Sequence, residues 1–185
     1  IEACKRFNKP VIADFDDNGF NIGDDNPAAE FYKRDVIHAC LDRIAVIADV
    51  VTVSTQGLAE VILNRTPNAN VKVVPNAIDD KMFHMDISTL PREKRILMRG
   101  GGSHDKDWLK YKDGIIQIMQ LYPDYKLSVM GFHPDWLRQI PAHQIEYYQF
   151  NDIPTYYSTL MELNPKIMIV PLLDNEFNRC KSAIA

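Results

Sequence analysis

The sequence predicts an α/β protein with two Rossmann-like halves, each built on a parallel sheet with helices on both faces. Short runs of apolar and β-branched residues alternate with longer segments in which apolar residues recur at helical spacing. This alternation occurs on both sides of residues 78–92, which have no clear period and contain Pro91, so they mark a boundary. Strands that alternate with helices form parallel sheets through right-handed crossovers, and such sheets bind ligands at the carboxyl ends of their strands.

In the first half, strands and helices are expected in alternation. The dipeptide Asn26-Pro27 supplies an N-cap and a proline at the first helical position, so a helix is expected from there to Ala48. A second helix is expected at residues 56–64, with Ser54 or Thr55 as its N-cap. The strands of this half are expected at residues 10–15, 50–54 and 71–74.

The second half repeats the pattern. One helix is expected at about residues 105–121 and another at residues 152–163, where Asn164-Pro165 ends it. The strands of this half are expected at residues 95–98, 125–130, 145–148 and 166–170.

The composition excludes several classes of protein. The 185 residues carry a net charge of −4 with acids and bases mixed along the chain, so no nucleic-acid partner is expected. Cys4, Cys40 and Cys180 form no Cys-x-x-Cys pair, which predicts free thiols in a reducing cytoplasm. No apolar run approaches the ~20 residues that cross a bilayer, and no signal peptide is recognised. Because the chain starts at Ile1 and its last residues read as an unfinished helix, we expect both halves to be incomplete.

A glycine-rich loop, Arg99-Gly-Gly-Gly-Ser103, connects a strand to a helix at the start of the second half. Glycines let a phosphate approach the backbone, and the N–H groups at the start of a helix favour an anion. Arg99 and Lys106 add positive charge, so this loop is predicted to bind phosphate. The alternative is a turn whose glycines are needed for a positive φ, because the loop matches neither the dinucleotide fingerprint nor the P-loop.

A second junction of strand and helix, at residues 177–182, carries an amide, two cations and a hydroxyl. Arg179 and Lys181 are predicted to lie in the first turn of the helix, where cations are unfavourable unless an anion compensates. This predicts a diphosphate site. The alternative is a pair of solvated surface charges.

Acidic residues follow the first expected strand, in the order Asp14-Phe-Asp16-Asp17. An Asp-x-Asp after a strand can hold a divalent cation together with a nucleotide diphosphate, and clustered carboxylates suit magnesium. The same acids can instead end the strand and cap the turn at Asn18-Gly19.

The histidines show no metal-ligand spacing, and no Ser/His/Asp order or nucleophile elbow occurs. His104 alone among them lies in a proposed site, with a structural role as the alternative.

Several of these segments resemble the family 4 glycosyltransferases. Residues 48–60, Ala-Asp-Val-Val-Thr-Val-Ser-Thr-Gln-Gly-Leu-Ala-Glu, and residues 71–79, Val-Lys-Val-Val-Pro-Asn-Ala-Ile-Asp, resemble the last strands of that family's N-terminal domain. Ala77 departs from the family, which usually has glycine there. Residues 95–103 resemble the first strand and loop of the donor-binding domain. Residues 169–182 resemble the "vPl…Fn..KS" segment of bacterial and phage-encoded members.

The resemblance implies a GT-B fold with an acceptor-side domain at residues 1–79, a linker at residues 80–92 and a donor-binding domain at residues 93–185. It implies sugar transfer from a nucleotide diphosphate-sugar to a glycan, lipid-linked or other hydroxyl acceptor, with retention and without a metal or other cofactor. Localisation would be cytoplasmic, and peripheral contact with the inner membrane face stays open. The residues implied to bind the donor diphosphate, besides Arg99 and Lys106, are Gly101, Gly102, Ser103, Asn178, Lys181 and Ser182.

Catalytic residues are not assigned by this resemblance. Asp16 and Asp17 are the candidates, through contact with the acceptor hydroxyl or with a linker residue. Two alternatives stay open. One is a metal-dependent transferase that uses Asp14 and Asp16, and the other is a non-catalytic module that binds a nucleotide or a partner protein.

Overall fold

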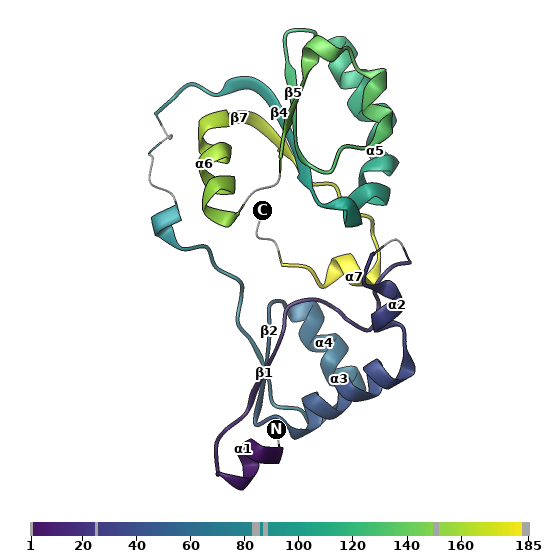
Figure 1. The fold of residues 1–185 in the computed structure, drawn as a ribbon, viewed down its shortest axis with the longest axis vertical. Helices are drawn as coiled ribbons and strands as arrows, with labels where there is room; N and C mark the ends of the chain where they lie inside the picture. The colour runs from purple at the N-terminus through teal and green to yellow at the C-terminus, as the bar shows by residue number, and fades with distance from the viewer. Residues whose placement is uncertain (1, 25, 83–85, 87–88, 150–151, 183–185) are drawn as a thin grey trace. The chain divides into compact units, whose positions relative to one another are not determined.

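The computed structural model describes residues 2–24, 26–82, 86, 89–149 and 152–182, which form two compact units (Figure 1). Unit 1 comprises Ile1–Ala77 and Asp174–Ala185, and unit 2 comprises Ile78–Leu173. Residues 174–182, which the sequence analysis places in the second half, therefore pack with unit 1.

Unit 1 is built on a parallel sheet with the strand order β1-β2-β3. Its strands are β1 (Ile12–Phe15), β2 (Val50–Val53) and β3 (Val71–Val73). Its helices are α1 (Glu2–Arg6), α2 (Ala29–Tyr32), α3 (Asp35–Ile47), α4 (Gln56–Arg65) and α7 (Glu176–Arg179).

The core of unit 1 lies between β2 and the helices α3 and α4. Val51 and Val53 are fully buried there because alternate residues of a strand point to the same face. They pack with Ala45, Leu58, Ala59, Ile62 and Cys180. Ile12 of β1 pairs in register with Val50, which alternates with the buried Val51, so Ile12 lies on the other face of the sheet and is 67% exposed. Within the described residues of unit 1, the core therefore lies on one face of the sheet, whereas helices were expected on both faces.

The predicted helix from Asn26 to Ala48 is wrong in two respects. Two helices occupy the segment, and the N-cap of the first is Ala28 and not Asn26. The Asn26 side chain accepts a hydrogen bond from the N–H of Ala28 at 2.9 Å, so the chain turns before α2 begins. Arg34 has an extended backbone with ψ 130°, which separates α2 from α3. The prediction for α4 is confirmed, with Thr55 as its N-cap, accepting from the N–H of Leu58 at 3.2 Å. Helix α1 was not predicted.

Unit 2 is a parallel sheet with the order β6-β5-β4-β7. Its strands are β4 (Glu93–Gly100), β5 (Lys126–Gly131), β6 (Ile145–Tyr148) and β7 (Pro165–Ile169). Its α-helices are α5 (Asp105–Leu121) and α6 (Ile153–Leu163). Short 3-10 turns are η1 (Asp80–Met82), η2 (Gly102–His104), η3 (Asp135–Gln139) and η4 (Ala142–Gln144).

Helices cover both faces of the sheet in unit 2, as Figure 1 shows for α5 and α6. The core on the α5 side includes Ile96, Met98, Trp108, Met119, Leu127 and Val129. The core on the α6 side includes Leu97, Met130, Tyr156, Tyr157 and Leu163. Asn164 ends α6 as predicted, in the left-handed region with φ 35°. None of the helices in the described part of the chain has the length and apolar character that crossing a bilayer requires.

Candidate functional site

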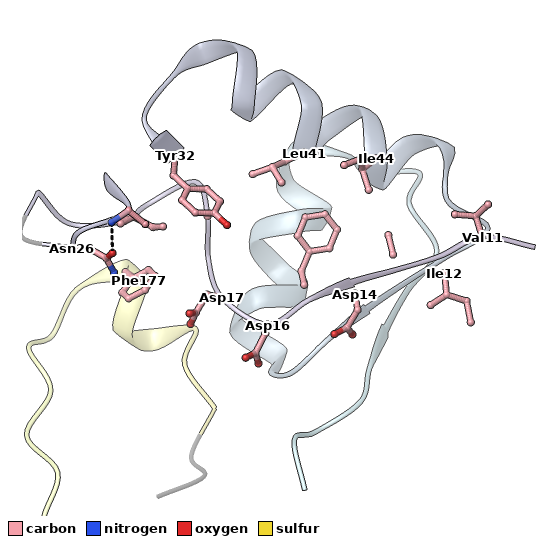
Figure 2. A pocket seen from close by; sticks show the side chains of 15 residues that line it. Val11, Ile12, Asp14, Asp16, Asp17, Asn26, Tyr32, Leu41, Ile44 and Phe177 are labelled. Carbon is pink, nitrogen blue, oxygen red and sulfur yellow. Dashed lines mark hydrogen bonds between the residues drawn. The ribbon is translucent and has the colours of Figure 1, made fainter. Parts of the chain in front are cut away.

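A cavity of about 650 Å³ lies in unit 1 between β1 and the helices α2 and α3 (Figure 2). Leu41 and Ile44 point from α3 toward β1 and form its apolar part. Its polar residues include Asp14, Asp16, Asp17, Asn26 and Tyr32. The cavity therefore combines an apolar wall with carboxylates at the end of a parallel strand, a common location for a ligand.

The carboxylates at this strand end have different partners. Asp14 accepts a hydrogen bond from the hydroxyl of Thr52 on the neighbouring strand. Asp16 accepts one from Asn76 Nδ2 at 2.8 Å. Asn76 belongs to unit 1 and lies outside the predicted linker at residues 80–92. In the described part of the chain, the carboxylate of Asp17 has no recorded hydrogen bond, and Asp17 lines the cavity.

Residues 174–182 pack closely on α4. The Thr55 hydroxyl donates to the carbonyl of Cys180 at 2.7 Å, and Asn18 Nδ2 donates to the Cys180 sulfur at 3.5 Å. A Cβ added at Gly57 would lie 3.0 Å from the carbonyl oxygen of Arg179, so the contact needs a glycine there. Burial raises the pKa of the Cys180 thiol. The segment is thus fixed to unit 1 through backbone groups and one buried side chain.

The prediction that Arg179 and Lys181 lie in the first turn of a helix is wrong for Lys181, whereas Arg179 is the last residue of the four-residue helix α7. The Asn175 side chain accepts from the N–H of Asn178 at 2.8 Å, so α7 begins at Glu176 and already ends at Arg179. Arg179 forms an ion pair with Asp174 at 2.6 Å. Lys181 follows the helix, with its Nζ 4.9 Å from the centre of the Phe177 ring. Lys181 therefore does not lie at a helix start, where a cation would be unfavourable without an anion.

In unit 2, the glycine loop lies at the point where the strand order reverses. From β4 the chain continues to β5 and β6 on one side, and then returns to β7 on the other side of β4. The carboxyl ends of β4 and β7 are consequently neighbours, which is the position where open parallel sheets bind ligands. Strand β4 extends through Gly100, two residues farther than predicted, and the turn η2 leads from there into α5.

The glycines of this loop are not needed for a left-handed backbone, and Gly100 makes a close contact that excludes a side chain. None of the three has a positive φ; in the described chain the glycine with a positive φ is Gly131, at 95°. A Cβ at Gly100 would lie 3.0 Å from Trp108 Cζ2, whereas one at Gly102 would make an ordinary contact of 3.7 Å with Phe132. The turn alternative is therefore not supported.

His104 and Asp107 connect two loops at the switch point. The Nδ1 atom of His104 lies 2.8 Å from Asp107 Oδ2, and the backbone N–H of Leu173 donates to Asp107 Oδ1 at 2.7 Å. The Asp107 side chain is 7% exposed, and that of His104 is 23% exposed. Asp107 was not predicted as a site residue, although its spacing of three from His104 at a helix start was a signal.

Arg99 extends from β4 on the face that α6 covers. Its guanidinium carbon lies 5.3 Å from the centre of the Tyr156 ring, a distance at which a cation and an aromatic face attract. Burial raises the pKa of Tyr156, and Arg99 opposes this in part. Lys106 is exposed in the first turn of α5. The side chain of Ser103 lies outside the described residues.

The residues predicted to bind the diphosphate fall into two groups. Arg99, Gly101, Gly102 and Lys106 lie together at the carboxyl end of β4 in unit 2. Asn178, Lys181 and Ser182 belong to the segment that packs with unit 1. Within the described residues, no group of three or more His, Cys, Asp or Glu side chains is arranged to hold a metal ion.

The chain consists of two Rossmann-like α/β units of the GT-B type, the fold class predicted from the sequence.

Two solved structures show what the chain is similar to. Sucrose-phosphate synthase from Thermosynechococcus elongatus matches with a TM-score of 0.58 and 15% identity, over 98% of this chain and 51% of that one. S. aureus MnaA, in a co-structure with UDP, matches with a TM-score of 0.49 and 14% identity, over 90% of this chain and 47% of that one. The chain thus spans about half the length of each. No family model matches the sequence, and no curated protein does.

Proposed function

We propose that the chain is part of a glycosyltransferase that moves a sugar from a nucleotide diphosphate-sugar to a glycan, lipid-linked or other hydroxyl acceptor. The observation that carries this proposal is the position of the glycine loop at the switch point between β4 and β7. A ligand phosphate at this position meets the start of a helix of 17 residues. The likeness in fold to sucrose-phosphate synthase supports the same class of protein.

In this proposal, unit 2 holds the donor. The backbone of Gly101 and Gly102 lets the diphosphate approach closely, and Arg99 and Lys106 supply positive charge. When the sugar leaves, negative charge grows on the diphosphate, and donors that are already in place stabilise it without reorganisation. Retention of configuration and transfer without a metal follow the family resemblance and belong to the proposal.

Unit 1 holds the acceptor in this proposal. The cavity beside β1 has a volume of about 650 Å³, in the range of small-molecule sites. Asp17 lines it and is positioned to accept a hydrogen bond from an acceptor hydroxyl. Asp16, whose carboxylate accepts a hydrogen bond from Asn76, orients the chain near the unit boundary.

Lys181, with Asn178 and Ser182 on the same segment, is assigned to the donor diphosphate by the resemblance.

Calorimetric and thermal-shift titrations test the proposal. The ligands are UDP, GDP and their sugars, with and without Mn²⁺, on the wild type and on Lys181→Ala. Lys72→Ala is the matched control, because Lys72 is an exposed lysine on β3 of the same unit. Binding of one nucleotide without Mn²⁺, weakened about tenfold or more by Lys181→Ala and unchanged by Lys72→Ala, is expected.

The other outcomes separate the alternatives. Binding that requires Mn²⁺ and ignores Lys181 would move the site to Asp14 and Asp16 and contradict the proposed architecture. Binding without any sugar transfer to a panel of hydroxyl acceptors would favour the non-catalytic module. No binding of any nucleotide would contradict the donor site in this chain.

A further inference from the structure

The pairing of His104 with Asp107 arranges an imidazole for a ligand. An ionised carboxylate only accepts hydrogen bonds, so the short Nδ1 to Oδ2 distance of 2.8 Å places a hydrogen on Nδ1. The second carboxylate oxygen is held by the N–H of Leu173 at 2.7 Å. Both oxygens of a buried carboxylate are therefore in use, which fixes the orientation of the imidazole ring.

The other ring nitrogen is directed away from this carboxylate. In the described part of the chain, His104 Nε2 has no recorded hydrogen-bond partner, and the side chain is 23% exposed. The ring packs on Gly100, whose added Cβ would lie 3.4 Å from His104 Cδ2. It is thus held against the last residue of β4, where the glycine loop begins.

The position of His104 and Asp107 in the fold indicates which ligand they can bind. Leu173 belongs to the loop after β7, and His104 belongs to the loop after β4, so Asp107 joins the two loops that flank the switch point. The carbonyl oxygen of Gly100 accepts a hydrogen bond from the N–H of Phe132 at 2.9 Å, which connects the end of β5 to the end of β4. The ends of β4, β5 and β7 therefore converge on the residues around His104.

We infer that His104 binds a phosphate oxygen of the donor diphosphate through Nε2, and that Asp107 is its positioning residue. This inference rests on the proposed function and adds to it a ligand-binding side chain and the group that orients it. In the complex, the imidazole donates from both nitrogens, one to Asp107 and one to the phosphate. A hydrogen bond between charged partners is stronger than a neutral one, which suits a phosphate at the start of α5.

The test compares two amides that reach different atoms of the imidazole. In His104→Asn the amide nitrogen stands near the position of Nδ1, and in His104→Gln it reaches toward that of Nε2. Calorimetric titrations use inorganic pyrophosphate, UDP and GDP. Binding to His104→Asn is expected to fall at least tenfold, equal to about 1.4 kcal/mol, with a smaller loss for His104→Gln. His133→Gln is the matched control, because His133 is exposed in the same unit and its ring contacts that of Tyr147 at a tilt of 51°.

A spectroscopic readout tests the role of Asp107. In Asp107→Asn the ¹⁵N shifts of the His104 ring nitrogens are expected to change together with a weaker affinity for pyrophosphate. A purely structural role would change the stability and the shifts of the ring nitrogens but leave the affinity for pyrophosphate as it is in the wild type. Melting temperatures of all variants are measured in parallel, so that a loss of fold is recognised.

The outcomes distinguish this inference from the proposed function. If the wild type binds UDP, GDP or pyrophosphate and His104→Asn binds it equally well, His104 is not a ligand and the proposed function stands. If the wild type binds none of the three, both fail.

Discussion

Thr55 offers the sharpest test of how residues 174–182 are held on unit 1. Its hydroxyl accepts a hydrogen bond from the N–H of Leu58 at 3.2 Å and donates one to the carbonyl of Cys180 at 2.7 Å. Thr55→Val keeps the branched shape and removes both bonds. Loss of an N-cap costs about 1 kcal/mol, and loss of the second hydrogen bond costs about 1 kcal/mol more. The free energy of unfolding of unit 1 should therefore fall by about 2 kcal/mol.

Backbone hydrogen exchange measures this loss of stability at the residues of unit 1 themselves. A loss of about 2 kcal/mol speeds exchange through unfolding of unit 1 by about 30-fold, and the increase is expected in α4 and in residues 175–182. Both tryptophans, Trp108 and Trp136, lie in unit 2. Urea unfolding followed by tryptophan fluorescence is therefore an internal control, and its midpoint should be the same in Thr55→Val as in the wild type. Thr55→Ser retains the hydroxyl and should cost less than about 0.5 kcal/mol. Unchanged exchange in Thr55→Val would refute the packing of this segment on α4.

Substitutions at three positions probe unit 2. Gly100→Ala places a Cβ 3.0 Å from Trp108, so the free energy of unfolding should fall by about 1–3 kcal/mol, measured by urea unfolding. Burial alone would raise the pKa of Glu146, but hydrogen bonds led by that from Arg95 lower it below its usual 4.5. A carboxyl with a depressed pKa stabilises the fold above that usual value and loses this contribution as pH falls through the folded pKa. Stability curves from pH 7 to pH 3 should therefore be flatter for Glu146→Gln, and equal slopes would contradict this. Asn164→Ala should lower the melting temperature, whereas Asn164→Gly should retain the left-handed backbone at φ 35° at less cost.

Features set by local chemistry could be predicted from the sequence. The β-branched run at residues 50–54, the cap at Thr55 and the helix end at Asn164 each depend on neighbours a few residues away. The alternation of these elements was sufficient to predict a parallel α/β fold in two units. The glycine loop was placed correctly at a strand end for the same reason.

Features that depend on distant contacts could not be predicted. The role of Asp107 requires the N–H of Leu173, which lies 66 residues away along the chain. The position of residues 174–182 on unit 1 depends on Thr55 and Gly57, which no local pattern connects to them. The break at Arg34 was likewise not predicted, because residues 28–47 contain no glycine or proline that would mark it.

The central claim is that the switch point of unit 2 binds a nucleotide diphosphate. Amide chemical shifts of the ¹⁵N-labelled chain, recorded while UDP or GDP is added without metal, test it most directly. The largest shifts are expected at Gly100–Gly102, at Phe132 and at Leu173, which surround the ends of β4, β5 and β7. Shifts confined to Asp14–Asp17 in unit 1, or shifts at the switch point that appear only with Mn²⁺, would contradict it.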